Sequence, residues 1–206
     1  MAKKLSFTNK CLDNKSPRIG GGALIENIVD WPTAPDGLPL TLVMSFPTSF
    51  FNENANLSLP EDHFISVFSY YSNSEYFLDN ITYHGSQEEL DWLRKGFTRV
   101  ICHVAGAEIF GSTVIPAMVI EVDEVDLDTS VPFGGSKIGG QPSLLQSEPL
   151  ELGSEQFALQ VYGNNFPRPY EGIFGLSDAV AYLFLDPTGM IATSSLEIGT
   201  FFVQVT

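Results

Sequence analysis

A short glycine turn occurs twice in this chain, and the repetition constrains its fold more than any other feature. Arg18-Ile19-Gly20-Gly21 and Lys137-Ile138-Gly139-Gly140 each place a basic residue before Ile-Gly-Gly, and a short apolar pair follows a few positions later. Glycine adopts positive φ angles without steric cost, so each copy predicts a tight turn. Because Gly-Gly pairs are common, the segments that follow each copy decide whether the match is informative.

The segments after the two turns match in kind, order and spacing. Residues 40–46 and 157–162 alternate large apolar with smaller or polar side chains, which is typical of a half-buried strand. A second apolar run follows in each half, at 64–70 and 180–185, with an acidic residue just ahead of it. Together these features predict an internal duplication with a period of about 120 residues.

The predicted fold class is mainly β: an α+β chain with few helices, in which two similar antiparallel β half-domains from an internal duplication are packed together. We expect one domain over residues 1–206, with a first repeat at 17–72, an insert at 73–130 and a second repeat at 131–206. A chain of this length can bury roughly 70% of its unfolded surface.

The insert contains the one helix that the sequence predicts clearly, at about residues 87–95. Ser86 and Glu89 have the spacing of a capping box, in which each side chain accepts a hydrogen bond from the other residue's backbone amide. Gly96 is expected to end the helix. The predicted apolar face consists of Leu90, Leu93 and Phe97.

The other segments of the first half are expected to be less regular. Residues 1–16 fit an extended arm or a short first strand, and a strand at 113–122 is interrupted by Pro116. Residues 31–39 and 47–60 are rich in Pro, Gly, Asn and Ser and are expected to be loops. Trp31 fits either a lid over the core or a contact residue for a partner.

The formal net charge of −15 is the strongest compositional signal. It argues against a nucleic-acid partner, because such binding depends on Lys and Arg neutralising phosphates. The same field would speed the encounter with a basic protein, although it also fits the solubility of a Phe-rich chain. No apolar run approaches the roughly 20 residues that span a bilayer, and no apolar segment of a secretory signal follows Lys3 and Lys4. We therefore expect a cytoplasmic protein without a membrane partner.

No motif in the sequence indicates catalysis or metal binding. Lys137 is followed by Ile-Gly-Gly, which does not favour a helix. The residues around Lys137 are therefore a poor match to a phosphate-binding loop, which precedes a helix. The three histidines, His63, His84 and His103, are isolated from other metal ligands. An acidic run lacks the glycine and the closing glutamate of an EF-hand, and it fits a solvated connector or an acidic docking patch. No metal or cofactor is expected, and a non-catalytic role is preferred without excluding an enzyme.

Three segments carry a resemblance to a known family. Ser136-Lys137-Ile138-Gly139-Gly140-Gln141-Pro142, then Phe157-Ala158-Leu159-Gln160-Val161, then residues 174–184 resemble the YwqG-like family of bacterial domains of unknown function. The first two match the family pattern closely, whereas Leu176-Ser177-Asp178-Ala179 stands where the family has a glycine-rich segment. The resemblance implies a largely β fold with an internal duplication and no established catalytic residues. It also implies an association with bacterial toxin–immunity loci.

Two functional hypotheses follow. The first is a non-catalytic immunity or adaptor protein that neutralises a basic toxin or effector protein by direct binding. Its candidate partner-binding residues are Trp31, Glu121, Asp123, Glu124, Asp126 and Asp128. The second is a small-ligand or enzymatic site in a pocket between the two repeats. Its candidate residues are Arg18, Lys137, Gln146, Gln160, Asn164 and Asp178. For Gln160 and Asp178 the alternative is a purely structural role, in which they satisfy backbone groups at strand ends.

Overall fold

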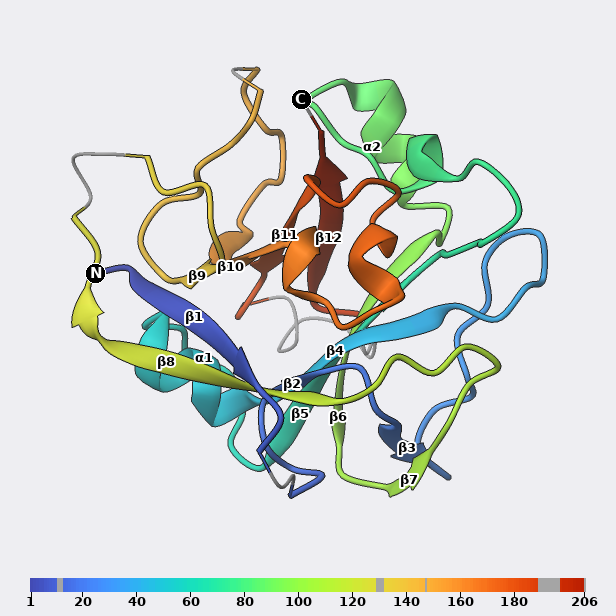
Figure 1. Cartoon of the computed structure of the whole chain (residues 1–206), viewed down its shortest axis with the longest axis horizontal. Coiled ribbons are helices and arrows are strands. Elements are labelled where there is room, and N and C mark those ends of the chain that lie inside the picture. Colours follow the sequence, from blue (N-terminus) through green and yellow to red (C-terminus); the bar gives the residue numbers. More distant parts are fainter. Residues whose placement is uncertain (11–12, 129–131, 147, 189–196, 206) are drawn as a thin grey trace.

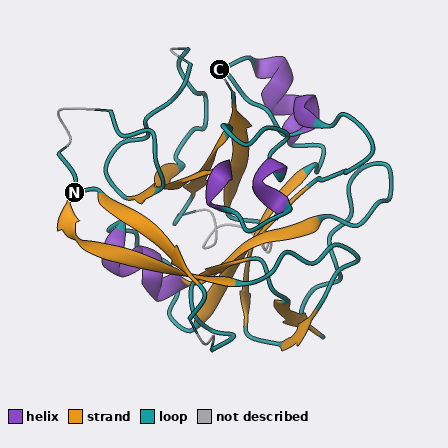
Figure 2. Ribbon diagram, viewed as in Figure 1, coloured by secondary structure: helices purple, strands orange, loops and turns teal. Residues whose placement is uncertain are grey.

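The fold is dominated by one large antiparallel sheet (Figures 1 and 2). The computed structural model describes residues 1–10, 13–128, 132–146, 148–188 and 197–205. Ten strands lie in the order β12-β11-β10-β9-β1-β8-β2-β4-β5-β6. Their bounds are β1 Lys3–Thr8, β2 Arg18–Ile19, β4 Thr41–Pro47, β5 His63–Ser69, β6 Thr98–Val104, β8 Met118–Asp126, β9 Lys137–Ile138, β10 Gln156–Tyr162, β11 Val180–Leu185 and β12 Gly199–Gln204. The mainly β prediction is confirmed.

Shorter elements surround this sheet. A two-stranded sheet pairs β3 (Ala23–Glu26) with β7 (Ala107–Ile109). The α-helices are α1 (Thr48–Asn54) and α2 (Gln87–Leu93), and the 3₁₀ helices are η1 (Leu78–Asn80), η2 (Gly163–Asn165) and η3 (Tyr170–Gly172). Within the described ranges no helix has the length and the apolar character that crossing a membrane requires.

The middle of the sheet is formed by two strands that are far apart in the sequence. β1 pairs with β8, and each also pairs with a two-residue strand, β1 with β9 and β8 with β2. Beyond β9 the sheet continues through β10, β11 and β12, and beyond β2 it continues through β4, β5 and β6. β9, β10, β11 and β12 form one wing of the sheet, and β2, β4, β5 and β6 form the other. Each wing therefore consists of one short strand followed by three long ones.

The repeated glycine turns lie directly after β2 and β9. Gly20 and Gly21 have φ angles of +61° and +79°, and Gly139 and Gly140 have +67° and +71°. An L-residue with a side chain rarely adopts these angles. The prediction that both Gly-Gly pairs form turns with positive φ is therefore confirmed.

The strands that follow the two turns also pair in the same way. Arg18 lies opposite Ser45 in β4, and Lys137 lies opposite Gln160 in β10. Both β4 and β10 contain a register irregularity close to this pairing, between Leu42 and Met44 and between Phe157 and Leu159. The amide of Gly20 donates to Val43 O at 3.0 Å, and that of Gly139 donates to Ala158 O at 2.9 Å.

The two ends of the large sheet approach each other, so that the sheet nearly closes on itself. An isolated antiparallel bridge joins Ile101 of β6 to Glu197, and Thr98 Oγ1 donates to Phe201 O of β12 at 2.8 Å. The other part of the β12 edge is covered by residues 81–83, since the amide of Tyr83 donates to Val203 O at 3.2 Å. Both arrangements satisfy backbone groups that an open edge would expose.

The core fills both sides of β11, which explains its uninterrupted apolar sequence. Ala181, Leu183 and Leu185 belong to the main cluster inside the curved sheet. Val180, Tyr182 and Phe184 face a second cluster, where Leu90 and Leu93 of α2 pack against them. A strand that is buried on both faces needs no polar alternation.

Three local predictions are wrong. Residues 47–60 contain helix α1 instead of a continuous loop, and Phe50 and Phe51 of this helix are buried. The strand expected at 113–122 lies at 118–126, so the acidic run belongs largely to a strand and not to a connector. The capping box does not form: Ser86 makes no side-chain capping bond, and Glu89 Oε2 accepts from the amide of His84 at 2.8 Å.

Other local predictions are confirmed. Residues 1–16 contain a first strand, β1. The helix predicted at about 87–95 is α2, and its apolar face is buried as expected. Trp31 covers the core, because its ring contacts Phe68 edge-on at 5.4 Å between centroids and its Nε1 donates to Leu40 O at 2.8 Å.

Candidate functional site

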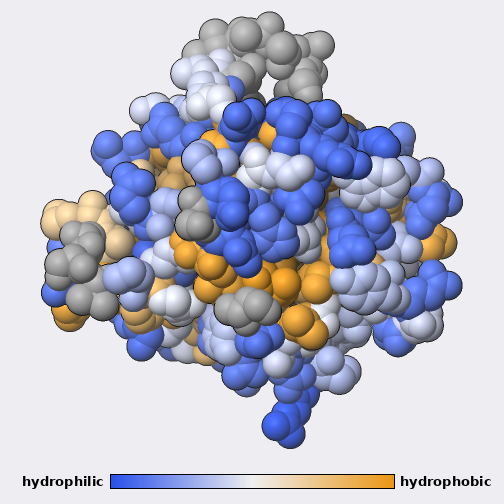
Figure 3. Space-filling view, turned by 90° about the horizontal axis from the view of Figure 1, so that it is seen from above, coloured by the Kyte–Doolittle hydropathy of each residue, from blue (hydrophilic) through white to orange (hydrophobic). Residues whose placement is uncertain are grey.

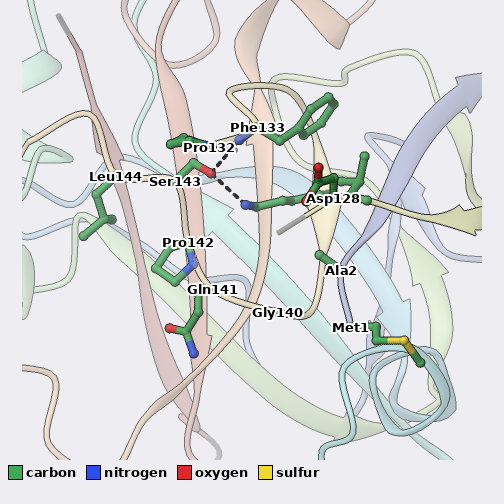
Figure 4. A pocket seen from close by; sticks show the side chains of 12 residues that line it. Met1, Ala2, Asp128, Pro132, Phe133, Gly140, Gln141, Pro142, Ser143 and Leu144 are labelled. Atoms are coloured by element: carbon green, nitrogen blue, oxygen red, sulfur yellow. Dashed lines mark hydrogen bonds between the residues drawn. The ribbon is translucent and has the colours of Figure 1, made fainter. Parts of the chain in front are cut away.

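A cavity of about 700 Å³ lies at the second glycine turn. Its walls come from Met1 and Ala2 before β1, residues 127–128 after β8, and the loop at 132–144 (Figure 4). Proline, phenylalanine and leucine side chains of that loop form the apolar part, and Lys137, Ser143 and Asp128 contribute polar groups. An open cavity with a few polar groups is a reasonable place for a small ligand.

Lys137 is the cation of this cavity and is only 6% exposed. Its Nζ donates to Ser143 Oγ at 2.7 Å, and the same oxygen accepts from the amide of Phe133 at 3.1 Å (Figure 4). Burial lowers the pKa of Lys137. An ammonium group has three hydrogens to donate, and one of them is used by Ser143 in the described part of the chain. The remaining hydrogens can meet a carboxylate or phosphate in the cavity.

Gln160 holds the loop that forms the cavity wall. Its side chain is fully buried beside Lys137, where Oε1 accepts from the amide of Ser143 at 2.9 Å. Its Nε2 donates to Phe133 O at 2.9 Å and to Gly135 O at 2.8 Å. All of these partners are backbone groups. The Gln160 side chain therefore has the structural role of satisfying backbone groups, which was the alternative to contacting a ligand.

Arg18 occupies the matching position at the first turn, with different surroundings. It is 2% exposed, and its Nη2 donates to Gly22 O at 2.6 Å and to Glu108 Oε1 at 3.1 Å. Burial lowers its pKa, and the charge of Glu108 opposes that shift. The atoms Nε and Nη1, together with Ser45 Oγ opposite them, are buried and have no hydrogen-bond partner among the described residues.

The remaining predicted pocket residues lie away from the cavity. Gln146 donates from Nε2 to Val205 O at 3.0 Å, beyond the end of β12. Asn164 in η2 and Asp178 before β11 are exposed. The structure thus brings Lys137 and Gln160 together, whereas Arg18, Gln146, Asn164 and Asp178 are not among the residues that line the cavity.

The acidic run is distributed over both faces of β8. Glu121 forms an ion pair with Lys10, and Asp123 Oδ1 accepts from Ser6 Oγ at 3.2 Å. Glu124 and Asp126 are exposed near the end of the strand, and Asp128 lies at the cavity. Alternation along a strand explains the division. Within the described ranges no group of three or more His, Cys, Asp and Glu side chains is arranged to hold a metal ion.

One serine–histidine pair has no signal in the sequence. Ser66 Oγ lies 2.9 Å from His103 Nε2, and His103 Nδ1 lies 2.7 Å from Val104 O. A carbonyl can only accept, so Nδ1 carries the hydrogen and Nε2 accepts from the serine. Burial lowers the pKa of His103. Ser66 and His103 are 0% and 1% exposed, so the pair is closed to a substrate and serves the core.

Glu155 lies at a smaller cleft of about 280 Å³ that Arg94 and Arg99 also line. Burial raises the pKa of its carboxyl to about 7. One oxygen accepts from Thr200 Oγ1 at 2.9 Å, and the other is buried without a partner in the described structure. The sequence offers no signal for this residue, because the shift depends on neighbours from three separate segments.

Comparison of the sequence with protein-family models and with curated proteins gives no match. The resemblance to the YwqG-like family stays a prediction that rests on the motifs quoted above.

Proposed function

We propose that this chain is a non-catalytic binding protein that uses its acidic surface to bind a basic protein partner. The distribution of charge is the observation that supports this function. All 25 Asp and Glu residues lie in the described part of the chain and none is a fully buried residue, although burial raises the pKa of the Glu155 carboxyl. Arg18 and Lys137, two of the ten basic residues, are buried. The surface is therefore more negative than the formal charge of −15 indicates, and such a surface attracts a basic partner.

The proposed partner is a toxin or effector that this cytoplasmic protein neutralises by covering it, as an immunity or adaptor protein does. The resemblance to the YwqG-like family supports this form of the proposal through the association of that family with bacterial toxin–immunity loci. The acidic residues of β8 are the proposed contact. Glu124 and Asp126 are suited to it, because both are exposed at one end of the strand.

The test is a binding titration with the purified product of the adjacent gene. Raising the salt concentration from about 0.05 M to about 0.5 M is expected to weaken the complex more than tenfold, because salt screens exposed charges. The double variant Glu124→Gln, Asp126→Asn should slow association. The control double variant Glu26→Gln, Asp30→Asn removes the same amount of charge elsewhere and should slow it less. Failure to associate at low salt would refute the proposal.

We also propose that the two wings of the sheet descend from an internal duplication. The support is the matched order of β1, β2, β4, β5 and β6 with β8, β9, β10, β11 and β12. Equivalent glycines, equivalent pairings and equivalent register irregularities accompany that order. These matches extend the two repeats into the predicted insert, because β6 and β8 both lie between residues 73 and 130.

A second candidate function is the binding of an anionic small molecule in the cavity at the second turn. The buried Lys137 ammonium at its wall favours this function. A panel of carboxylates and phosphates should contain a compound that raises the melting temperature. Lys137→Met should abolish that rise, and Lys4→Met, on the neighbouring strand and exposed, should preserve it. A panel without any shift would count against the site.

A further inference from the structure

Trp92 of α2 presents one face of its ring to solvent in a fixed orientation. The side chain is 42% exposed, and its Nε1 donates to Asn80 Oδ1 at 3.0 Å. The ring also stacks on Phe97, with 5.6 Å between centroids and 21° between planes. An exposed aromatic side chain that is already ordered loses little entropy on binding, which is a property of interface hot spots.

The outer face of this ring already holds a cation. Lys95 Nζ lies 4.0 Å from the centroid of the Trp92 ring. Lys95 itself is exposed and forms no ion pair with a carboxylate in the described part of the chain. The Trp92 ring therefore acts as a cation-binding surface. Lys95, the cation that it now binds, is held there only by a weak, solvent-exposed cation–π interaction.

The segment that leads to α2 is acidic and contains a second exposed aromatic side chain. Tyr76 is 73% exposed, and its hydroxyl donates to Asp79 Oδ1 at 2.8 Å. Asp79 precedes Asn80 in η1, which lies beside α2 (Figures 1 and 2). Residues 75–95 contain five acidic and two basic residues. Figure 3 looks down on this side of the molecule and shows hydrophilic surface around a central apolar area.

We propose that the exposed face of Trp92 binds an arginine side chain of the basic partner, which takes the place of Lys95. This inference rests on the proposed acidic binding function and adds a second contact with the partner, on α2, to the contact proposed on β8. Arginine fits better than lysine, because its planar guanidinium stacks on an aromatic ring and is more weakly hydrated. The carboxylates of the surrounding segment supply the complementary charge.

The probe is a short peptide of alternating arginine and glycine, compared with the same peptide containing citrulline, the neutral isostere of arginine. The chain has two tryptophans, so Trp31→Phe leaves Trp92 as the only one. In this background the arginine peptide is expected to change the tryptophan fluorescence, and the citrulline peptide is not. Calorimetry measures the affinity of variants that lack Trp92.

Matched variants separate the ring from the general charge. Lys95→Ser removes the present occupant and is expected to tighten the arginine peptide about 2- to 5-fold. Arg94→Ser makes the same charge change next to it and should tighten the peptide less. Trp92→Leu should weaken binding by a similar factor, and Phe110→Leu, at a 59% exposed aromatic residue in another region, should leave it unchanged. Melting temperatures establish that each variant is folded.

The outcomes distinguish this inference from the proposed function. Equal effects of Lys95→Ser and Arg94→Ser would overturn the inference, because charge alone would then explain both. Salt-sensitive binding that survives Trp92→Leu would also overturn it and leave the acidic binding function standing. If the wild-type protein does not bind the arginine peptide at low salt, the inference is overturned, whereas the acidic binding function is decided separately by the titration with the product of the adjacent gene.

Discussion

Gly20→Ala is expected to lower the free energy of unfolding by about 2–5 kcal/mol, which combines left-handed backbone strain with overpacking. Gly20 has a φ of +61°. A β-carbon placed there would lie 2.5 Å from the carbonyl oxygen of Ile115 and 2.9 Å from its Cβ. Moving backbone atoms aside costs free energy, because either the turn or the segment around Ile115 must shift. Urea denaturation should show a lower midpoint with an unchanged slope.

Gly153→Ala is the matched control for this variant. Gly153 has nearly the same φ, +62°, but its β-carbon would meet nothing within 4 Å. Only the strain of the left-handed conformation remains, so the expected loss is about 1–2 kcal/mol. Equal losses in the two variants would mean that the close approach to Ile115 contributes nothing to the constraint at the first turn.

Gln160→Leu is expected to lower the free energy of unfolding by about 2–4 kcal/mol, since buried polar groups that lose their partners cost about 1–3 kcal/mol each. The substitution removes three hydrogen bonds, to the amide of Ser143 and to the carbonyls of Phe133 and Gly135. The loop at 132–144 loses its anchor to β10, and some of the freed groups reach water. Denaturation gives the magnitude, and faster hydrogen exchange at the amide of Ser143 locates the effect.

Ser45→Ala provides the comparison at the first turn. Ser45 lies opposite Arg18 as Gln160 lies opposite Lys137, but its buried hydroxyl has no partner among the described residues. Removing it should change stability by less than about 1 kcal/mol and can even increase it, because an unpaired buried hydroxyl is unfavourable. A large loss would show that Ser45 makes an interaction that the described structure lacks.

The sequence predicts the strands of the large sheet well, because their signals are local. β4, β5, β10 and β11 appear as apolar or alternating runs bounded by turn residues, and the structure has strands at those places. Helix α1 has no such local signal, for a physical reason. Its sequence has weak helix propensity, and the burial of Phe50 and Phe51 against Phe46 supplies the stability that propensity does not.

The candidate sites were less predictable, since they depend on residues that meet only in the folded chain. Arg18 and Lys137 occupy matching positions, yet Glu108 covers one and the loop carrying Ser143 covers the other. No local pattern indicates which segment folds over which turn. The Trp92–Lys95 contact fits the helix predicted at about 87–95, in which residues three apart lie on the same face, although α2 itself ends at Leu93.

The placement of β1 has a consequence for synthesis of the chain. β1 leaves the ribosome before the other strands of the large sheet, yet its partners are β8 and β9. Ser6 and Asp123, which are hydrogen-bonded across the β1–β8 pair, are separated by 117 residues. The nascent chain must therefore carry an unpaired strand until β8 has been made, more than 100 residues later. The middle of the sheet is completed late, and neither wing can be joined to the other before then.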